Sequence, residues 1–208
     1  MEFRPRYRRS LSHGMYHDSI VKGDFRGGLA IQANCSEMTF ESCQMDQINF
    51  SGSKFKDCLF LHCSMPGANF NATTLDGCTF QGCNLDMAGF RASSIWGTNF
   101  IDGRAEYASF EEALIRDVTF DTQLHGADLR FSSARNLDMG DSNLWGAANN
   151  WSCRNYKNVR FSVRQVEIIL ALIAKTAGNE ELRTSIKSLV SAKMARVVDT
   201  LVDAEEAE

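Results

Sequence analysis

Residues 76–95 read DGCTF QGCNL DMAGF RASSI, four groups of five residues that each end in a large apolar residue. The rhythm extends from Phe25 to Phe120, where all twenty fifth positions are apolar and eleven are phenylalanine. A helix needs apolar residues about every 3.6 positions and a strand every second one, so a period of five fits neither. Each group therefore forms one side of a regular coil, and successive coils stack.

The residue two positions before each apolar centre is also restricted, because nearly all of these residues are small. They are Ala33, Cys43, Ser53, Cys58, Cys63, Ala68, Thr73, Cys78, Cys83, Ala88, Ser93, Thr98, Ala108, Ala113 and Val118. One large and one small inward residue per group fill a narrow tube without voids. With Asn or Asp between them, as in Ala68-Asn69-Phe70 and Ala127-Asp128-Leu129, this unit resembles the pentapeptide-repeat family over residues 18–161.

This resemblance implies an all-β solenoid, a right-handed four-sided β-helix of about six to seven coils. The sequence supports four groups per coil independently, because every twentieth residue from Phe40 to Phe120 is phenylalanine, as is every twentieth residue from Phe50 to Phe110. Two facing walls should therefore be phenylalanine ladders. The rhythm loses one residue near Asp121, which predicts a small bulge, and the next centres are Leu124, Leu129, Ala134, Met139 and Leu144.

Three segments follow from these patterns. Residues 1–17 form a basic N-terminal arm with Arg4, Arg6, Arg8 and Arg9, residues 18–161 form the coil, and residues 162–208 change to a helical period. A first C-terminal helix is expected to cap the open coil end. A second helix carries an apolar face that predicts a homodimer contact, with folding back on the first helix as the alternative. That face consists of Leu182, Ile186, Leu189, Met194, Val197 and Leu201.

The seven cysteines invite a metal or disulfide interpretation, which the repeat argues against. Six of them fall at inward positions of the coil, where cysteine acts as a small buried apolar residue. No Cys-x-x-Cys pair occurs and the four histidines have no ligand spacing, so we expect no metal and no cofactor. The packed interior, and the lack of a phosphate-binding loop or nucleophile motif, make an enzyme the least favoured class.

The charge pattern favours a protein partner. The chain has a formal net charge of −4, and its coil is acidic. An acidic rod attracts a protein surface built to hold DNA and repels DNA itself, so we expect no direct binding of nucleic acid by the coil. The carboxylates expected to form one partner-binding face are Asp46, Asp86, Asp102, Glu106, Glu111, Glu112, Asp117 and Asp121.

Two stretches, Phe80 to Arg91 and Arg104 to Phe110, resemble the corresponding parts of pentapeptide-repeat proteins of the Qnr and MfpA types. The resemblance implies a dimeric DNA mimic that modulates DNA gyrase or topoisomerase IV. Qnr proteins interrupt their coils with loops important for quinolone resistance, whereas the repeat here is unbroken from Phe25 to Phe120. This difference suits inhibition or modulation of a topoisomerase better than drug protection.

An alternative function is a protein interaction scaffold or an assembly component, in a signalling, effector or phage particle context. Its contact patch would be the outward apolar residues Leu61, Trp96 and Ile101, because such side chains anchor interfaces better than charges do. The sequence shows no run of eighteen apolar residues and no secretory leader, so we expect a cytoplasmic protein that does not contact a membrane.

Overall fold

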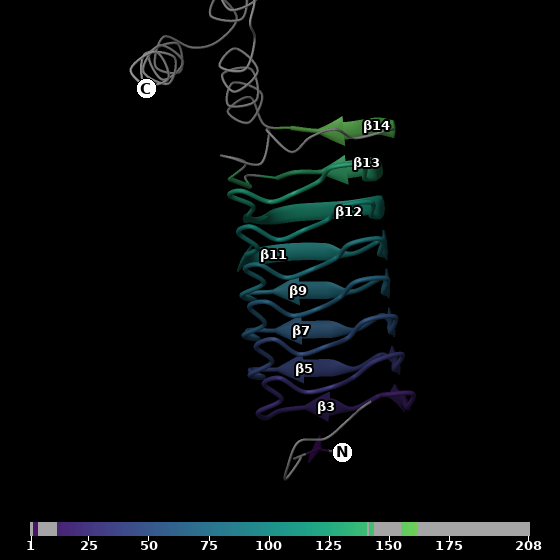
Figure 1. Ribbon diagram of the computed structural model, residues 1–208, viewed down its shortest axis with the longest axis vertical. Helices are drawn as coiled ribbons and strands as arrows, with labels where there is room; N and C mark the ends of the chain where they lie inside the picture. The colour runs from purple at the N-terminus through teal and green to yellow at the C-terminus, as the bar shows by residue number, and fades with distance from the viewer. Residues whose placement is uncertain (1, 4–11, 141, 144–154, 162–208) are drawn as a thin grey trace, which may run out of the picture.

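The described residues of the computed structural model, 2–3, 12–140, 142–143 and 155–161, build one parallel β-helix whose coils stack along a single axis (Figure 1). One side of the coil, here called the even side, consists of β2 (Met15–His17), β4 (Asn34–Ser36), β6 (Lys54–Lys56), β8 (Thr74–Asp76) and β10 (Ser94–Trp96). The next side, the odd side, consists of β1 (Glu2–Phe3), β3 (Ile20–Val21), β5 (Thr39–Glu41), β7 (Leu59–Leu61), β9 (Thr79–Gln81) and β11 (Asn99–Arg104). The last strands, β12 (Leu114–Gln123), β13 (Ser133–Asp138) and β14 (Asn155–Arg160), contribute to both sides.

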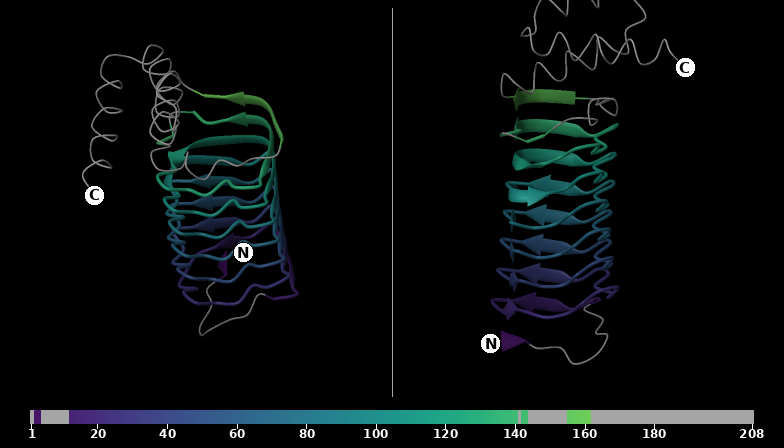
Figure 2. Two further views of the ribbon diagram at one scale, coloured as in Figure 1. Left: turned by 45° about the horizontal axis from the view of Figure 1, so that its top comes forward. Right: turned by 90° about the vertical axis from the view of Figure 1, so that its left-hand side faces the viewer.

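Two further sides are held by isolated parallel bridges rather than by strands. The Asn84 side contains Asp24, Gln44, Ser64, Asn84 and Arg104, and the Asn69 side contains Leu29, Asn49, Asn69, Gly89, Ser109 and Asp128. The chain passes from the Asn84 side to the Asn69 side, then along the even and odd sides, before it begins the next coil. Figure 2 shows the stacked coils from two further directions. The predicted four-sided solenoid is therefore confirmed.

The strand register gives the length of each turn. Between Met15 and Ser133 on the even side, six turns contain 19, 20, 20, 20, 20 and 19 residues. The predicted loss of one residue after Phe120 is confirmed, because the pairing of β11 with β12 shifts between Ile101 and Gly103. The short first turn was not predicted, and it places β2 inside the coil, ahead of the boundary expected at residue 18.

The interior is filled by stacked rings, as the columns of phenylalanine predict. Phe40, Phe60, Phe80, Phe100 and Phe120 stack with centroids 4.5–4.9 Å apart, and Phe50, Phe70, Phe90 and Phe110 stack with centroids 4.8–5.0 Å apart. The two ladders meet edge to face across the coil, with the Phe70 and Phe80 centroids 5.8 Å apart. All twenty predicted centres from Phe25 to Phe120 are buried.

The small inward residues help to satisfy backbone carbonyls of the coil. The thiol of Cys63 donates to the carbonyl of Phe40 at 3.3 Å, the thiol of Cys83 donates to that of Phe60 at 3.3 Å, and the Ser53 hydroxyl donates to that of Ala30 at 2.6 Å. A buried carbonyl without a donor is costly, so cysteine, serine and threonine at these positions combine small size with a donor, whereas alanine supplies small size alone. Six cysteines, those from Cys35 to Cys83, are buried and free.

Each corner of the coil requires a left-handed backbone. From residue 27 to residue 117, the second residue after every centre has a positive φ between 51° and 68°. Glycine adopts this conformation at no steric cost, whereas other residues pay a penalty, so glycine is frequent at these positions. Side chains other than glycine at a corner project outward, which becomes important for the surface described below.

Of the segment 1–17 the structure describes residues 2–3 and 12–17, and the segment 162–208 lies wholly outside the described residues. The basic residues of the N-terminal arm, and the expected C-terminal cap and dimer helices with their apolar face, lie outside the described residues. None of the described residues belongs to a helix that could span a membrane.

Candidate protein-binding surface

The filled interior leaves the outer surface as the place where this coil can contact another molecule. Within the described part of the chain, no group of His, Cys, Asp and Glu side chains could hold a metal ion. The thiols are held away from solvent, and burial raises the pKa of Cys35 to about 12. A buried protonated thiol is a poor nucleophile and a poor metal ligand.

The eight carboxylates expected to form one acidic face are spread around the coil. Asp46, Asp86 and Glu106 lie on the Asn84 side, and Glu111 and Glu112 lie on the Asn69 side. Asp102 and Asp121 lie on the odd side. Asp117 lies in β12, between the even and odd sides. The expectation of a single acidic face is therefore wrong. Acidic residues that are close in the sequence lie on different sides of the coil, because the chain moves to the next side every five residues.

Hydrogen bonds and ion pairs occupy several of these carboxylates. Arg91 contacts both Glu111, at 3.6 Å, and Glu112, at 3.1 Å. Asp46 accepts a hydrogen bond from the Ser64 hydroxyl at 2.7 Å. Among the described residues, no ion pair is recorded for Asp102, Glu106 or Asp121, so these three carboxylates are the ones most available to a partner.

Asp86 is the largest departure from the predicted acidic face. Its exposed fraction is 6%, and its carboxylate pairs with the Arg104 guanidinium and accepts a hydrogen bond from the Glu106 backbone N–H at 3.1 Å. The hydrogen bond from Arg104 to Asp86 raises the pKa of the arginine. Asp86 therefore holds one coil to the next, and it offers no free carboxylate to a partner.

The alternative apolar patch is not continuous. Leu61 and Ile101 lie on the odd side with Gln81 between them in register, and both are half-buried. Trp96 is 39% exposed, but it belongs to the even side. The three residues do not form one contact surface.

A different apolar feature lies where the Asn84 side turns into the Asn69 side. Met87 and Tyr107 occupy corner positions of successive coils and are 66% and 58% exposed. Both have left-handed backbones, with φ of 56° and 57°, which cost bulky residues about 1–2 kcal/mol each. We call Met87, Tyr107 and the adjacent His125 the Tyr107 corner.

The Tyr107 ring is held in a defined position. Its hydroxyl lies 3.1 Å from Nε2 of His125, and the two rings meet edge to face with centroids 5.3 Å apart. Gly126 occupies the next corner, where a β-carbon would lie 2.5 Å from the tyrosine ring. A side chain at Gly126 would therefore displace Tyr107. The sequence does contain a signal for this corner. Met87 and Tyr107 are large residues at the repeat position where glycine recurs, two residues after each apolar centre.

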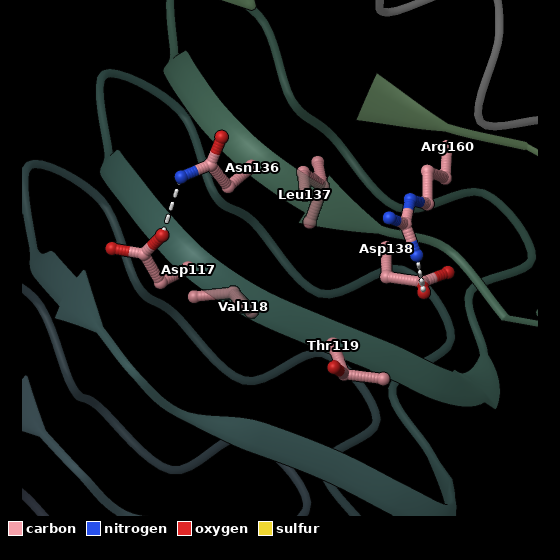
Figure 3. A pocket seen from close by; sticks show the side chains of 7 residues that line it. All are labelled: Asp117, Val118, Thr119, Asn136, Leu137, Asp138 and Arg160. Carbon is pink, nitrogen blue, oxygen red and sulfur yellow. Dashed lines mark hydrogen bonds and ion pairs between the residues drawn. The ribbon is translucent and has the colours of Figure 1, made fainter. Parts of the chain in front are cut away.

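A shallow hollow of about 510 Å³ lies beside β12, β13 and β14 (Figure 3). Asn136 donates to Asp117 at 2.6 Å at one end, and Arg160 lies 3.9 Å from Asp138 at the other. These polar groups are mutually paired, and no histidine, cysteine or serine is among the residues that line the hollow. Both carboxylates of the hollow, Asp117 and Asp138, are therefore engaged by another residue of its lining.

The geometry defines the class of protein: a solid parallel β-helix with a five-residue period, whose outer surface is free to bind. Residues 53–129 match the family model for the pentapeptide repeat region. Residues 53–129 therefore form a pentapeptide repeat region, and the coil continues the same pattern on both sides of them.

Solved structures with related coils have low identity to this chain. A trypsin-treated form of QnrB1, a plasmid-mediated fluoroquinolone resistance protein, is 18% identical with a TM-score of 0.34, and the match covers 77% of this chain and 96% of that one. A pentapeptide repeat protein from the thylakoid lumen of Arabidopsis thaliana is 16% identical with a TM-score of 0.36, over 74% of this chain and 72% of that one. HetL, involved in heterocyst differentiation regulation in the cyanobacterium Nostoc, is 12% identical with a TM-score of 0.28, over 73% and 89%. No curated protein sequence matches the chain.

Proposed function

We propose that this chain is a non-enzymatic binding protein that engages a protein partner through the outer surface of its coil. The observation that carries the proposal is the Tyr107 corner. Two large apolar side chains are exposed there at backbone positions that disfavour them, and Tyr107 contacts the surface residue His125 rather than the core. Large side chains kept at positions that cost conformational energy often serve a function.

The chemistry of the Tyr107 corner suits a protein interface. Tyrosine and methionine are enriched at the centres of interfaces, and a ring that is already ordered loses little entropy on binding. Tyr107 meets this condition because its hydroxyl and its ring both contact His125, in the space that Gly126 leaves open. Arg104 and Glu106 lie beside the corner, so polar contacts can surround the apolar anchor.

We further propose that the partner is a type II topoisomerase, DNA gyrase or topoisomerase IV, which also requires a cytoplasmic location. Support comes from the sequence resemblance of Phe80 to Arg91 to Qnr and MfpA proteins, and from charge. Residues 12–140 contain sixteen acidic and nine basic residues, a net charge of −7. Duplex DNA of about 30 Å carries roughly 18 phosphate charges, so the rod would imitate DNA only in part.

The distribution of carboxylates changes how this imitation would work. Because they lie on several sides, a protein that encloses the rod would meet more of them than a flat surface would. Of the eight carboxylates predicted for the acidic face, Asp102, Glu106 and Asp121 form neither an ion pair nor a side-chain hydrogen bond among the described residues, so they should contribute most to steering.

A DNA supercoiling assay with purified gyrase tests this proposal. The wild-type protein should inhibit supercoiling, and added salt should weaken inhibition because exposed charges are screened. Replacing Asp102, Glu106 and Asp121 by lysine should reduce inhibition at least about tenfold, whereas Glu37→Lys, near the other end of the rod, should change it less than about twofold.

Two results would count against different parts of the proposal. If the wild-type protein does not alter supercoiling at micromolar concentration, the topoisomerase is not the partner. If inhibition occurs but is unchanged in the double variant Met87→Asn/Tyr107→Asn, the Tyr107 corner is not the binding surface.

A further inference from the structure

A column of basic residues runs along the even side near the C-terminal end of the coil. Strand pairing places Arg116 of β12 beside Arg135 of β13, and Arg135 beside Lys157 of β14. Neighbouring strands are about 4.8 Å apart, so the three residues follow one another at the shortest spacing that the fold allows. Like charges at opposed positions destabilise a sheet, which means that folding does not favour this column.

The two arginines of this column have no acidic partner recorded within the described coil. Both Arg116 and Arg135 are exposed, and neither lies within 4.0 Å of a carboxylate of the described residues. Five other arginines of the described coil do contact a carboxylate, namely Arg26, Arg91, Arg104, Arg130 and Arg160. Asp117, next to Arg116 in the sequence, instead accepts a hydrogen bond from Asn136.

Large apolar side chains lie next to the column on the same side. Trp96 is the register partner of Arg116 one coil earlier and is 39% exposed. Leu114 precedes Arg116 by two residues, so both project from the same side of β12, and it is 53% exposed. This surface therefore offers both positive charge and apolar area to a partner.

We propose that the surface formed by Trp96, Leu114, Arg116 and Arg135 binds an acidic amphipathic helix of a partner protein. Helix residues three or four apart share one face and rise about 4.5–6 Å along the axis. This rise is close to the step of about 4.8 Å between coils. A helix lying along the rod therefore presents one carboxylate to each basic residue in turn.

The contacts of such a helix follow from the chemistry of the surface. Guanidinium groups form charge-assisted hydrogen bonds with carboxylates, and the apolar face of the helix covers Trp96 and Leu114. A nucleic acid fits less well, because residues 12–140 carry a net charge of −7 and would repel a long polyanion. The column lies on a different side from the Tyr107 corner, so its failure would leave the proposed function intact.

Fluorescence anisotropy with the full chain and a labelled helical peptide tests the inference. The peptide carries glutamate at every third or fourth position and leucine beside it, and a twin peptide carries lysine in place of glutamate. The chain should bind the glutamate peptide and not the lysine peptide. The double variant Arg116→Gln/Arg135→Gln should bind at least about tenfold more weakly, with no loss of melting temperature, because no recorded ion pair is removed.

A matched control comes from the same column. Lys56 lies two coils before Trp96, beside Asp76, and Lys56→Gln should leave peptide binding within about twofold of wild type. The inference is overturned if the glutamate peptide does not bind, or if it binds the double variant as tightly as wild type. It is also overturned if single-stranded DNA of twenty thymidines binds more tightly than the peptide and loses affinity in the double variant.

Discussion

Replacement of Phe80 by alanine should be among the most destabilising single changes in the coil. Phe80 is 1% exposed and stacks between Phe60 and Phe100, with centroids 4.5 and 4.9 Å away. It also meets Phe70 edge to face at 5.8 Å. Alanine at a buried phenylalanine costs about 3–5 kcal/mol, and each lost ring contact adds about 0.5–1.5 kcal/mol, so we expect the upper part of this range, about 5 kcal/mol.

Urea denaturation followed by circular dichroism measures this loss. Phe80→Leu keeps most of the volume but removes the ring contacts, so it should cost about 1.5–3 kcal/mol. Phe25→Ala is the matched control: Phe25 is 7% exposed, and no ring contact is recorded for it among the described residues. Phe25→Ala should therefore cost less than Phe80→Ala. Equal losses at the two positions would refute the reasoning that stacked rings stabilise the centre of the rod.

Three further predictions concern other parts of the chain. Gly103→Ala should destabilise the coil by about 1–3 kcal/mol in urea titrations, because the new β-carbon would lie 2.5 Å from the Cys83 carbonyl oxygen; an unchanged midpoint would contradict this. Burial raises the pKa of Cys35 to about 12, so the folded state keeps a thiol proton that the unfolded state loses above about pH 8.5. The free energy of unfolding should therefore fall by up to about 1.4 kcal/mol per pH unit between about pH 8.5 and pH 12. Cys35→Ala should reduce that slope, and an identical slope in the variant would contradict the raised pKa of Cys35. If the chain is a homodimer, light scattering should give twice 23.2 kDa, and Leu189→Glu should halve that mass; a monomeric wild-type protein would exclude the predicted dimer contact.

The sequence predicted the interior well because each inward position depends on local spacing. Phenylalanine at every twentieth residue is sufficient to predict the ladder from Phe40 to Phe120, and the missing residue after Phe120 predicted the shift at Gly103. The first short turn was not predicted, because Val21 and Phe25 are four residues apart and the change lies ahead of the regular repeat.

The outer surface was predicted less well because it depends on the side to which each residue belongs. Asp86 has the same position in its repeat as Asp46, yet the Arg104 side chain buries it. The importance of Met87 and Tyr107 depends on the left-handed backbone of the corner, which the repeat pattern alone does not reveal. Spacing determines which residues point inward, whereas neighbouring coils determine which outward groups remain available.

The free energy of unfolding of the double variant Met87→Asn/Tyr107→Asn tests the central claim most directly. Asparagine tolerates the left-handed backbone, and the relief of about 1–2 kcal/mol per residue should offset the lost contacts of Tyr107 with His125. We predict a free energy of unfolding within about 1 kcal/mol of wild type, as expected for side chains kept for binding. A loss above about 2 kcal/mol would show that the Tyr107 corner serves the fold, and would contradict its role as a binding surface.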